Sequence, residues 1–361
     1  MSLDTDHVDD PDGSFVESTG PFGPHGLRGA VELAGIALTS LLAVVMLSFI
    51  ALYWLRDTAL GAPAYEQFMI AGQWVDVYLG TRVFRHPFMW QSLATGVLIG
   101  VVAPMVGTFV VHREMALIGE TLAHTAFAGV AVGLLVGGFF GWSGSLLLVA
   151  LVVSVLGALA LQWLTENTNS YGDVPIAIML SGSFAVGTLL ISWGREFMSV
   201  TIDIEGYLFG SLAIVTAGGA RLMAVLSVLV VALVVYNYNQ LLFVTFDEQA
   251  AQVAGFEVRW YNALLIVMTA VVVVGAMQIL GVILVAAMLV VPVAAASQVA
   301  LSFRETLVLS ILFGQLSILG GFAFAIGVSL PPGGSIVVVA IAIYLLCILL
   351  SDRSVAALSV H

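Results

Sequence analysis

Long apolar segments follow one another along most of the chain. They occupy residues 33–55, 88–111, 116–140, 142–164, 174–193, 220–237, 261–279, 281–301, 304–326 and 334–351. Most approach or exceed the ~20 residues that a helix needs to span the hydrocarbon of a bilayer. A shorter segment, from Tyr207 to Ala217, is too brief to cross and is expected to form a re-entrant half-helix. The pattern predicts an all-α integral membrane protein, a polytopic bundle of about nine or ten helical segments.

Polar segments divide the chain into four parts. Residues 1–30 are rich in aspartate, a composition that favours a disordered tail. Residues 31–86 are expected to hold an additional N-terminal transmembrane helix followed by a polar linker. The main transmembrane domain is then expected over residues 87–351, with a C-terminal tail over residues 352–361.

Composition supports insertion into a membrane. Hydrophobic residues make up 61% of the chain, charged residues 9%, and mean hydropathy is +1.11, whereas soluble domains carry roughly 25% charged residues. All ten basic residues are arginine, and the 22 acidic residues give a formal net charge of −12. This lysine-free, acidic composition resembles that of proteins adapted to high salt, which suggests a halophilic archaeon as the source. No basic stripe is present to bind nucleic acid, so the expected contact is membrane lipid.

Two further observations exclude classes of chemistry. The single cysteine, Cys347, lies in the last apolar segment, so an internal disulfide and a thiolate-rich metal site are excluded. Any metal ligands must therefore be imidazole and oxygen donors. Because lysine is absent, the chain has no Gly-x-x-x-x-Gly-Lys-Ser/Thr phosphate loop and does not hydrolyse ATP by that route. We do not expect the chain to be an enzyme.

One pair of ionisable residues lies inside a predicted span. Glu120 and His124 are four residues apart and therefore share one face of a helix. An ionisable side chain within a span is costly and usually faces a cavity where it has a function. A carboxylate and an imidazole on consecutive turns can bind one ion at the ~2.0–2.2 Å typical of zinc, and they also suit manganese. Thr121 and Thr125 lie beside the pair and are candidate hydrogen-bond partners that would orient these ligands.

Other interpretations of the pair are open at this point. Glu120 would have a structural role as a first-turn acid favoured by the helix dipole, with His124 hydrogen-bonded to it. The pair would relay protons in a proton-coupled secondary transporter, or bind metal in an intramembrane metal-dependent enzyme. The connection from His112 to Glu114, by contrast, is expected to be a solvated loop without a functional role.

The residues around this pair resemble a known family. The segment from Val111 to Gly129 reads VHREMALIGETLAHTAFAG and is similar to the signature segment of the zinc/manganese class of ABC importer permeases. That signature has an arginine-containing turn followed by Leu-Ile-Gly-Asp-x-Leu-x-His, whose acid and histidine match Glu120 and His124. Glutamate in place of aspartate keeps the charge and extends the reach by one methylene. Further similar stretches are YLFGS at Tyr207, the segment Asp247 to Gly255, GVILVAAMLVVPVAAA at Gly281 and PGGSI at Pro332.

The resemblance implies a type II ABC importer-like fold in the plasma membrane. It implies a permease that imports zinc or manganese by alternating access, with Glu120 and His124 implicated in binding the transported ion and no permanently bound cofactor. The implied partners are a second permease chain in a homodimer, two separate ATPase subunits and an extracellular metal-binding protein.

The resemblance also assigns a role to the polar segment before residue 258. It implies a short cytoplasmic coupling helix that docks onto the ATPase subunit. Small alanine side chains there would allow close approach, and acids would favour the start of the helix. The residues concerned are Asp247, Glu248, Ala251 and Gly255.

Overall fold

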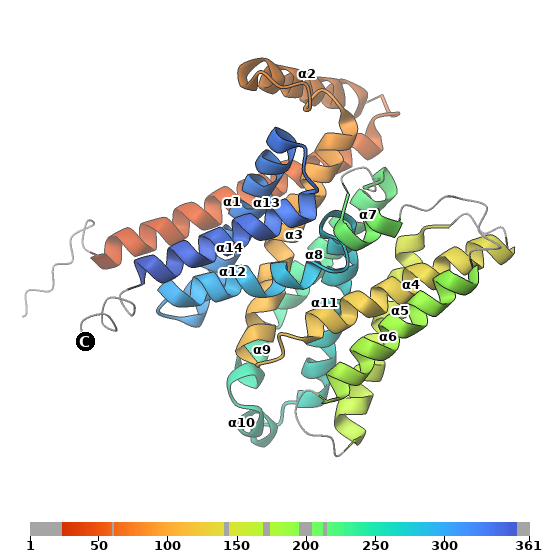
Figure 1. Ribbon diagram of the computed structural model, residues 1–361. Coiled ribbons are helices and arrows are strands. Elements are labelled where there is room, and N and C mark those ends of the chain that lie inside the picture. Colours follow the sequence, from red (N-terminus) through yellow and green to blue (C-terminus); the bar gives the residue numbers. More distant parts are fainter. Residues whose placement is uncertain are drawn as a thin grey trace, which may run out of the picture.

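The computed structural model describes residues 24–59, 61–140, 144–168, 174–194, 204–211 and 215–351, which form helices and no strand. The helices are α1 (Pro24–Leu55), α2 (Gly61–Leu79), α3 (Pro87–His112), α4 (Ile118–Phe140), α5 (Leu146–Asn167), α6 (Val174–Gly194), α7 (Ile204–Phe209), α8 (Ala217–Tyr236), α9 (Tyr238–Phe246), α10 (Glu248–Val253), α11 (Val258–Leu280), α12 (Val285–Val299), α13 (Phe303–Val328) and α14 (Pro332–Leu350) (Figure 1). Within these ranges, 9 helices are long and apolar enough to cross a membrane, and α12 is an apolar helix of 15 residues. The predicted all-α bundle is confirmed.

Helices α3 and α11 form the centre of the bundle. In the apolar stretch of each helix, 89% of the residues of α3 and 83% of those of α11 are buried. The corresponding shares are 22% for α6 and 28% for α1. Helix α3 contacts α1, α8, α11, α12 and α13, while α11 also contacts α4 and α5. A Cβ atom on Gly107 of α3 would lie 2.0 Å from the carbonyl oxygen of Leu289 in α12, so only glycine lets these two backbones meet.

Two groups of helices flank this centre. Helices α4, α5 and α6 pack together on one side, and α12, α13 and α14 pack together on the other, with α1 against α13 (Figure 1). Helix α4 lies at the boundary between the groups, because it contacts α11 and α12 as well as α5 and α6. Residues on α4 are therefore placed where the two groups meet.

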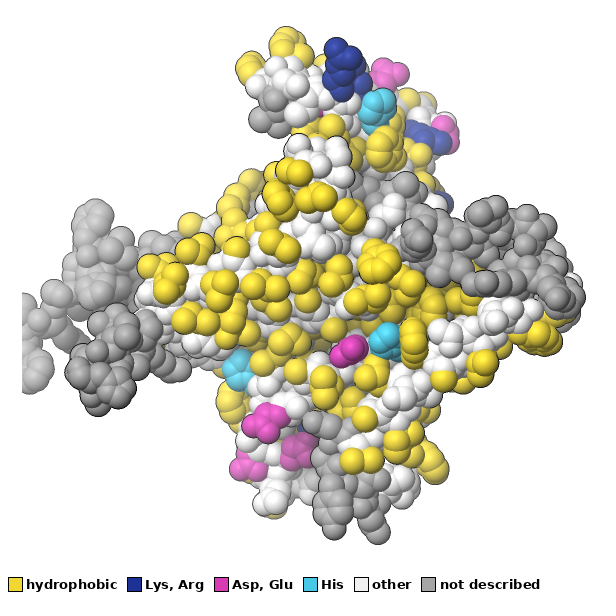
Figure 2. All heavy atoms as spheres, viewed as in Figure 1, with side chains coloured by type: hydrophobic (Ala, Val, Ile, Leu, Met, Phe, Trp, Pro, Cys, Tyr) yellow, Lys and Arg dark blue, Asp and Glu magenta, His cyan; other side chains and the backbone are white. Residues whose placement is uncertain are grey.

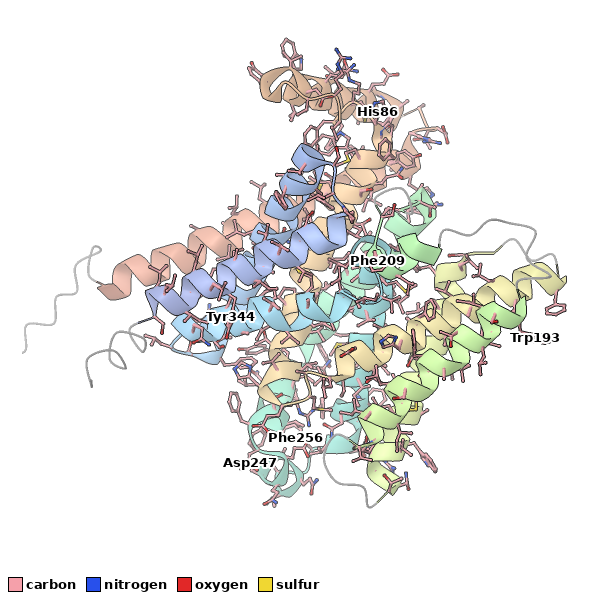
Figure 3. The ribbon with its side chains drawn as sticks, in the orientation of Figure 1. His86, Trp193, Phe209, Asp247, Phe256 and Tyr344 are labelled. Atoms are coloured by element: carbon pink, nitrogen blue, oxygen red, sulfur yellow. The ribbon has the colours of Figure 1, made fainter. Side chains whose placement is uncertain are left out.

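The surface is apolar in the middle and polar at two opposite ends. Figure 2 shows a broad hydrophobic band, with charged and histidine side chains over α2 at one end and acidic side chains near α9 and α10 at the other. His86 and Asp247 mark these two ends in Figure 3. Hydrocarbon excludes charge, so this distribution is the one a membrane-spanning protein requires.

Two features of the N-terminal region were not predicted from the sequence. Helix α1 begins at Pro24, so the last part of the predicted disordered tail is helical; residues 1–23, like residues 352–361, lie outside the described structure. The predicted polar linker contains helix α2. The ring of Phe68 in α2 lies 5.0 Å from that of Phe49 and 4.9 Å from that of Trp90. Packing on the bundle thus stabilises a helix that the local composition does not predict.

A short helix, α7, occurs near the predicted half-helix. It ends at Phe209, and the φ of +79° at the following Gly210 favours glycine. The N–H of Ile283 donates to the carbonyl of Leu208 (3.3 Å), which ties α7 to the connection between α11 and α12. Helix α7 is shorter and begins earlier than the predicted segment 207–217, of which residues 212–214 lie outside the described structure.

Asp76 organises the connection between α2 and α3. Its side chain is 1% exposed and accepts hydrogen bonds from the N–H groups of Val83, Phe84 and Arg85, each at 2.9 Å, and from the hydroxyl of Thr81 at 2.8 Å. Burial alone would raise the pKa of Asp76, but the hydrogen bonds favour the carboxylate and lower the pKa to about 2.

We expect strong acid to loosen this connection. Because the pKa of Asp76 is depressed in the folded protein, its contribution to stability is fully present above the ordinary pKa of 3.8 and is lost as the pH falls through about 2. Hydrogen–deuterium exchange of residues 81–86, corrected for intrinsic rates, should therefore accelerate below about pH 3. Asp76→Ala should exchange rapidly at neutral pH, whereas Glu66→Gln, at an exposed position of α2, should match the wild type. Unchanged protection in Asp76→Ala would contradict this role.

Candidate metal site and coupling helix

Glu120 and His124 lie near the start of α4. A tight turn precedes this helix: Glu114 has a φ of +58°, and the N–H of Met115 donates to the carbonyl of Val110 at 3.0 Å. Glu120 falls in the first turn of α4, where the helix dipole favours an acid. His124 follows one turn later on the same face.

The pair lines a cavity of about 460 Å³ between α4, α6, α7 and the connection between α11 and α12. Glu120 is the one acid and His124 the one imidazole on its wall. A cation that enters this cavity meets a single carboxylate as its charged partner. The remaining lining residues are Phe127, Phe184, Thr188, Ile191, Ser192, Leu208 and Ile283.

The imidazole of His124 is held in place but keeps a free nitrogen. The ring of Phe184 in α6 packs against it edge to face, with centroids 5.0 Å apart and planes at 74°. The Nδ1 atom of His124 is buried and has no hydrogen-bond partner among the residues that the structure describes. Most buried polar atoms are hydrogen-bonded, so this ring nitrogen is available to a ligand that enters the cavity. The alternative in which His124 is merely hydrogen-bonded to Glu120 through this atom is not what the structure shows.

The described residues supply two ligands of the usual kinds and no more. No group of three or more His, Cys, Asp or Glu side chains that could hold a metal occurs in the described ranges. Glu120 and His124 alone would supply two of the four ligands that zinc usually takes. For a metal to bind here, water, a second chain or another protein would have to provide the remaining ligands.

Thr121 and Thr125 face α6. The hydroxyl of Thr121 donates to the carbonyl of Leu117 (3.1 Å) and lies 3.4 Å from that of Ile176. The hydroxyl of Thr125 donates to the carbonyl of Thr121 (2.9 Å) and lies 3.0 Å from the Oγ of Ser183. In this conformation the two threonines fasten α4 to α6, and their role beside the metal ligands stays a prediction.

A short helix is confirmed between Asp247 and Gly255. The side chain of Asp247 caps α10 by accepting the N–H of Ala250 at 2.8 Å. Gly255 has a φ of +85°, which ends the helix with a turn that favours glycine. Asp247 and Phe256 lie at the tip of this end of the molecule in Figure 3, so α10 is placed where another subunit can reach it.

The face that α10 presents differs from the predicted one. Ala251 is fully buried and packs with Val244 and Val258, so it holds α10 on its own chain and is not available to a partner. The exposed apolar side chain is that of Val253, which is 90% exposed. Residues two apart on a helix point in nearly opposite directions, and the sequence alone does not say which of the two faces is buried.

Arg113 corrects the expectation that the connection before α4 is a solvated loop. Its side chain is only 7% exposed and forms an ion pair with Glu248 of α10. Burial lowers the pKa of Arg113 and the carboxylate of Glu248 raises it, and the group remains a cation. The two residues are 135 positions apart, so no local pattern could have revealed the contact. Through this pair, α10 is linked to the turn that precedes Glu120.

The chain is similar in sequence to the membrane proteins of two metal transport systems. The manganese transport system membrane protein MntC of Halalkalibacterium halodurans is 28% identical over 272 residues, which covers 75% of this chain and 90% of that protein. The high-affinity zinc uptake system membrane protein ZnuB of Haemophilus influenzae is 26% identical over 265 residues, covering 73% and 98%.

A solved structure shares both fold and sequence. The complex PsaBC from Streptococcus pneumoniae contains a chain with a TM-score of 0.65 and 30% identity, covering 74% of this chain and 93% of that one. The family model described as the ABC 3 transport family matches residues 85–351. With this match and its membrane-spanning helices, the chain belongs to the ABC 3 transport family and is a multi-pass membrane permease.

Proposed function

We propose that this chain forms the path by which a divalent metal ion, zinc or manganese, enters the cell, with Glu120 and His124 binding the ion on its way. The observation that carries the proposal is the buried, unpaired Nδ1 of His124 beside Glu120 in a cavity. One imidazole and one carboxylate suit both metals, so these ligands do not select between them. The names of the manganese and zinc relatives support the same pair of ions.

A homodimer completes the site in this proposal. Two copies related by a two-fold axis would bring two Glu120 and two His124 side chains to one point, which gives the four ligands that zinc prefers. The metal is cargo, so binding must be reversible, and a site shared between two chains can open when they move apart.

ATP hydrolysis on separate subunits drives the cycle. Docking of α10 on an ATPase subunit transmits its movement through the Arg113–Glu248 pair to the turn before α4. Arg113 lies seven residues before Glu120, so a shift of α10 moves the ligand-bearing start of α4 and changes the side to which the site opens. In this arrangement the α10 end is cytoplasmic, and the α2 end receives metal from an extracellular binding protein.

Reconstituted uptake tests the proposal. The full chain, assembled with its ATPase subunits in proteoliposomes, should accumulate Zn²⁺ or Mn²⁺ only with ATP and the binding protein present. A protonophore should leave uptake unchanged, because no proton gradient drives it. Uptake that follows a proton gradient without ATP would instead support a secondary transporter and overturn the proposal.

Docking through α10 gives a separate prediction. Val253→Asp should weaken binding of the ATPase subunit by about 30-fold, the effect of losing ~2 kcal/mol at the centre of an interface. The control is Leu301→Asp at the start of α13, where the side chain is 73% exposed at the same end of the molecule. Affinity measured by surface plasmon resonance should fall in the first variant alone. If both variants bound the ATPase subunit with equal affinity, α10 would not be part of the interface.

A further inference from the structure

A second cavity lies far from the metal site. It has a volume of about 650 Å³, roughly four times that of the ~150 Å³ cavity that holds one benzene ring. Its walls come from α1, α3, α8 and α13, and α1 lies outside residues 85–351, which match the family. The additional N-terminal helix therefore builds one wall of a groove in the membrane-spanning part of the bundle. We call it the α1 groove.

The α1 groove has a mostly apolar lining whose polar side chains are Thr39, Ser40 and Ser227. The hydroxyl of Thr39 donates to the carbonyl of Gly35 at 2.8 Å, and that of Ser227 donates to the carbonyl of Met223 at 2.7 Å. These two hydroxyls are used within their own helices, which leaves Ser40 of α1 as the remaining hydroxyl on the wall. The groove thus offers mainly hydrocarbon contact, which suits an apolar acyl chain better than a polar ligand.

The length of the groove suits an extended hydrocarbon chain. On α8 the lining runs from Ser227 to Val235, which corresponds to about 12 Å along a helix. One end of the groove lies toward the α10 end of the bundle, because α8 leads there into α9. Tyr236, which is 84% exposed, follows the last lining residue of α8. Aromatic side chains of this kind are enriched at the level of lipid head groups.

A cation lies at the same end of the groove. Arg304, Val308 and Ile311 share one face of α13, so Arg304 lies one turn beyond the lining residue Val308. Arg304 is exposed and has no ion pair among the described residues. The neighbouring acid, Glu305, is engaged locally, since its carboxylate accepts the N–H of Leu301 at 2.7 Å.

We propose that the α1 groove binds one acyl chain of an anionic phospholipid, whose phosphate lies against the guanidinium of Arg304. The acyl chain fills the space between α1 and α8, and the phosphate pairs with the arginine at the mouth. The lipid fastens the additional helix to the bundle. The proposal does not depend on which ion the protein transports.

Lipid binding to the full chain tests it. Native mass spectrometry of the delipidated protein should show one tightly bound phosphatidylglycerol, preferred over phosphatidylcholine with the same acyl chains by about fivefold, the factor that one arginine contributes near an anionic surface. Arg304→Gln should remove that preference while one lipid still binds. Ala43→Phe, which fills the groove, should remove the tightly bound lipid of either type. The control, Ala342→Phe on the exposed face of α14, should bind lipid like the wild type.

Two further measurements make each outcome decisive. Dihexanoyl phosphatidylglycerol and inorganic phosphate, which lack a long chain, should bind at least tenfold more weakly than the long-chain lipid. Thermal unfolding of each variant in detergent checks that it is folded. A lipid count unaffected by Ala43→Phe, or equal affinity for both head groups in the wild type, would overturn the proposal. A groove occupied by a second copy of the chain would appear as a dimer that Ala43→Phe dissociates, and would overturn it as well.

Discussion

Replacing Glu120 or His124 with alanine is expected to lower metal uptake by roughly 100-fold or more, because each change removes a ligand from a site that has two per chain. Glu120→Asp should retain uptake within about tenfold of the wild type, since it keeps the carboxylate and shortens its reach by one methylene. Uptake of radioactive Zn²⁺ or Mn²⁺ into proteoliposomes that contain the ATPase subunits measures both effects.

The control for this experiment is an acid remote from the cavity. Glu66→Ala, at an exposed position of α2, should transport like the wild type. Co-purification with the ATPase subunits separates loss of the site from failure to assemble. Alanine variants that assemble and still transport at the wild-type rate would exclude the pair from the path of the ion.

Removing the link between α10 and the turn before α4 is expected to uncouple ATP hydrolysis from transport. Arg113 is 7% exposed and Glu248 47% exposed, so Arg113→Ala removes a partly buried ionic hydrogen bond worth about 1.5 kcal/mol. We expect uptake to fall about tenfold, while ATP hydrolysis and metal binding continue. The ratio of ions transported to ATP hydrolysed is the measurement.

A charge exchange distinguishes coupling from local damage. The double variant Arg113→Glu with Glu248→Arg restores the pair in reverse and should recover part of the lost transport, whereas each single change should not. Asp247→Asn, which alters an adjacent acid that caps α10, provides a matched control. Single variants that keep the wild-type ratio of transport to hydrolysis would show that the pair has no part in coupling.

The sequence predicts the spanning helices well because the hydrocarbon imposes a simple rule. A span must be long and apolar, and this rule located all nine long helices found in the described ranges. The rule does not predict a helix that is stabilised by packing against other parts of the chain. Helix α2 is stabilised by contact of Phe68 with Phe49 and Trp90, which lie elsewhere in the chain. The high-salt source inferred from the lysine-free composition is tested neither by the fold nor by the relatives, and it stays a prediction.

In the candidate site, too, some features follow from the sequence and others depend on tertiary structure. Glu120 and His124 are four apart on one helix, so their shared face follows from the sequence. Arg113 and Glu248 meet only because α3 ends and α10 begins at the same side of the bundle. No spacing rule joins positions so far apart. The unpaired Nδ1 of His124 depends on how Phe184 of α6 packs against the ring. Such details require tertiary structure.

Equilibrium metal binding tests the central claim most directly. The complex of this chain with its ATPase subunits, without nucleotide, should bind one Zn²⁺ or Mn²⁺ per two permease chains, measured by dialysis against the radioactive ion. The same complex carrying Glu120→Ala with His124→Ala should bind none at that site. One ion bound per single chain would contradict the shared site, and unchanged binding in the double variant would contradict the assignment of Glu120 and His124 as its ligands.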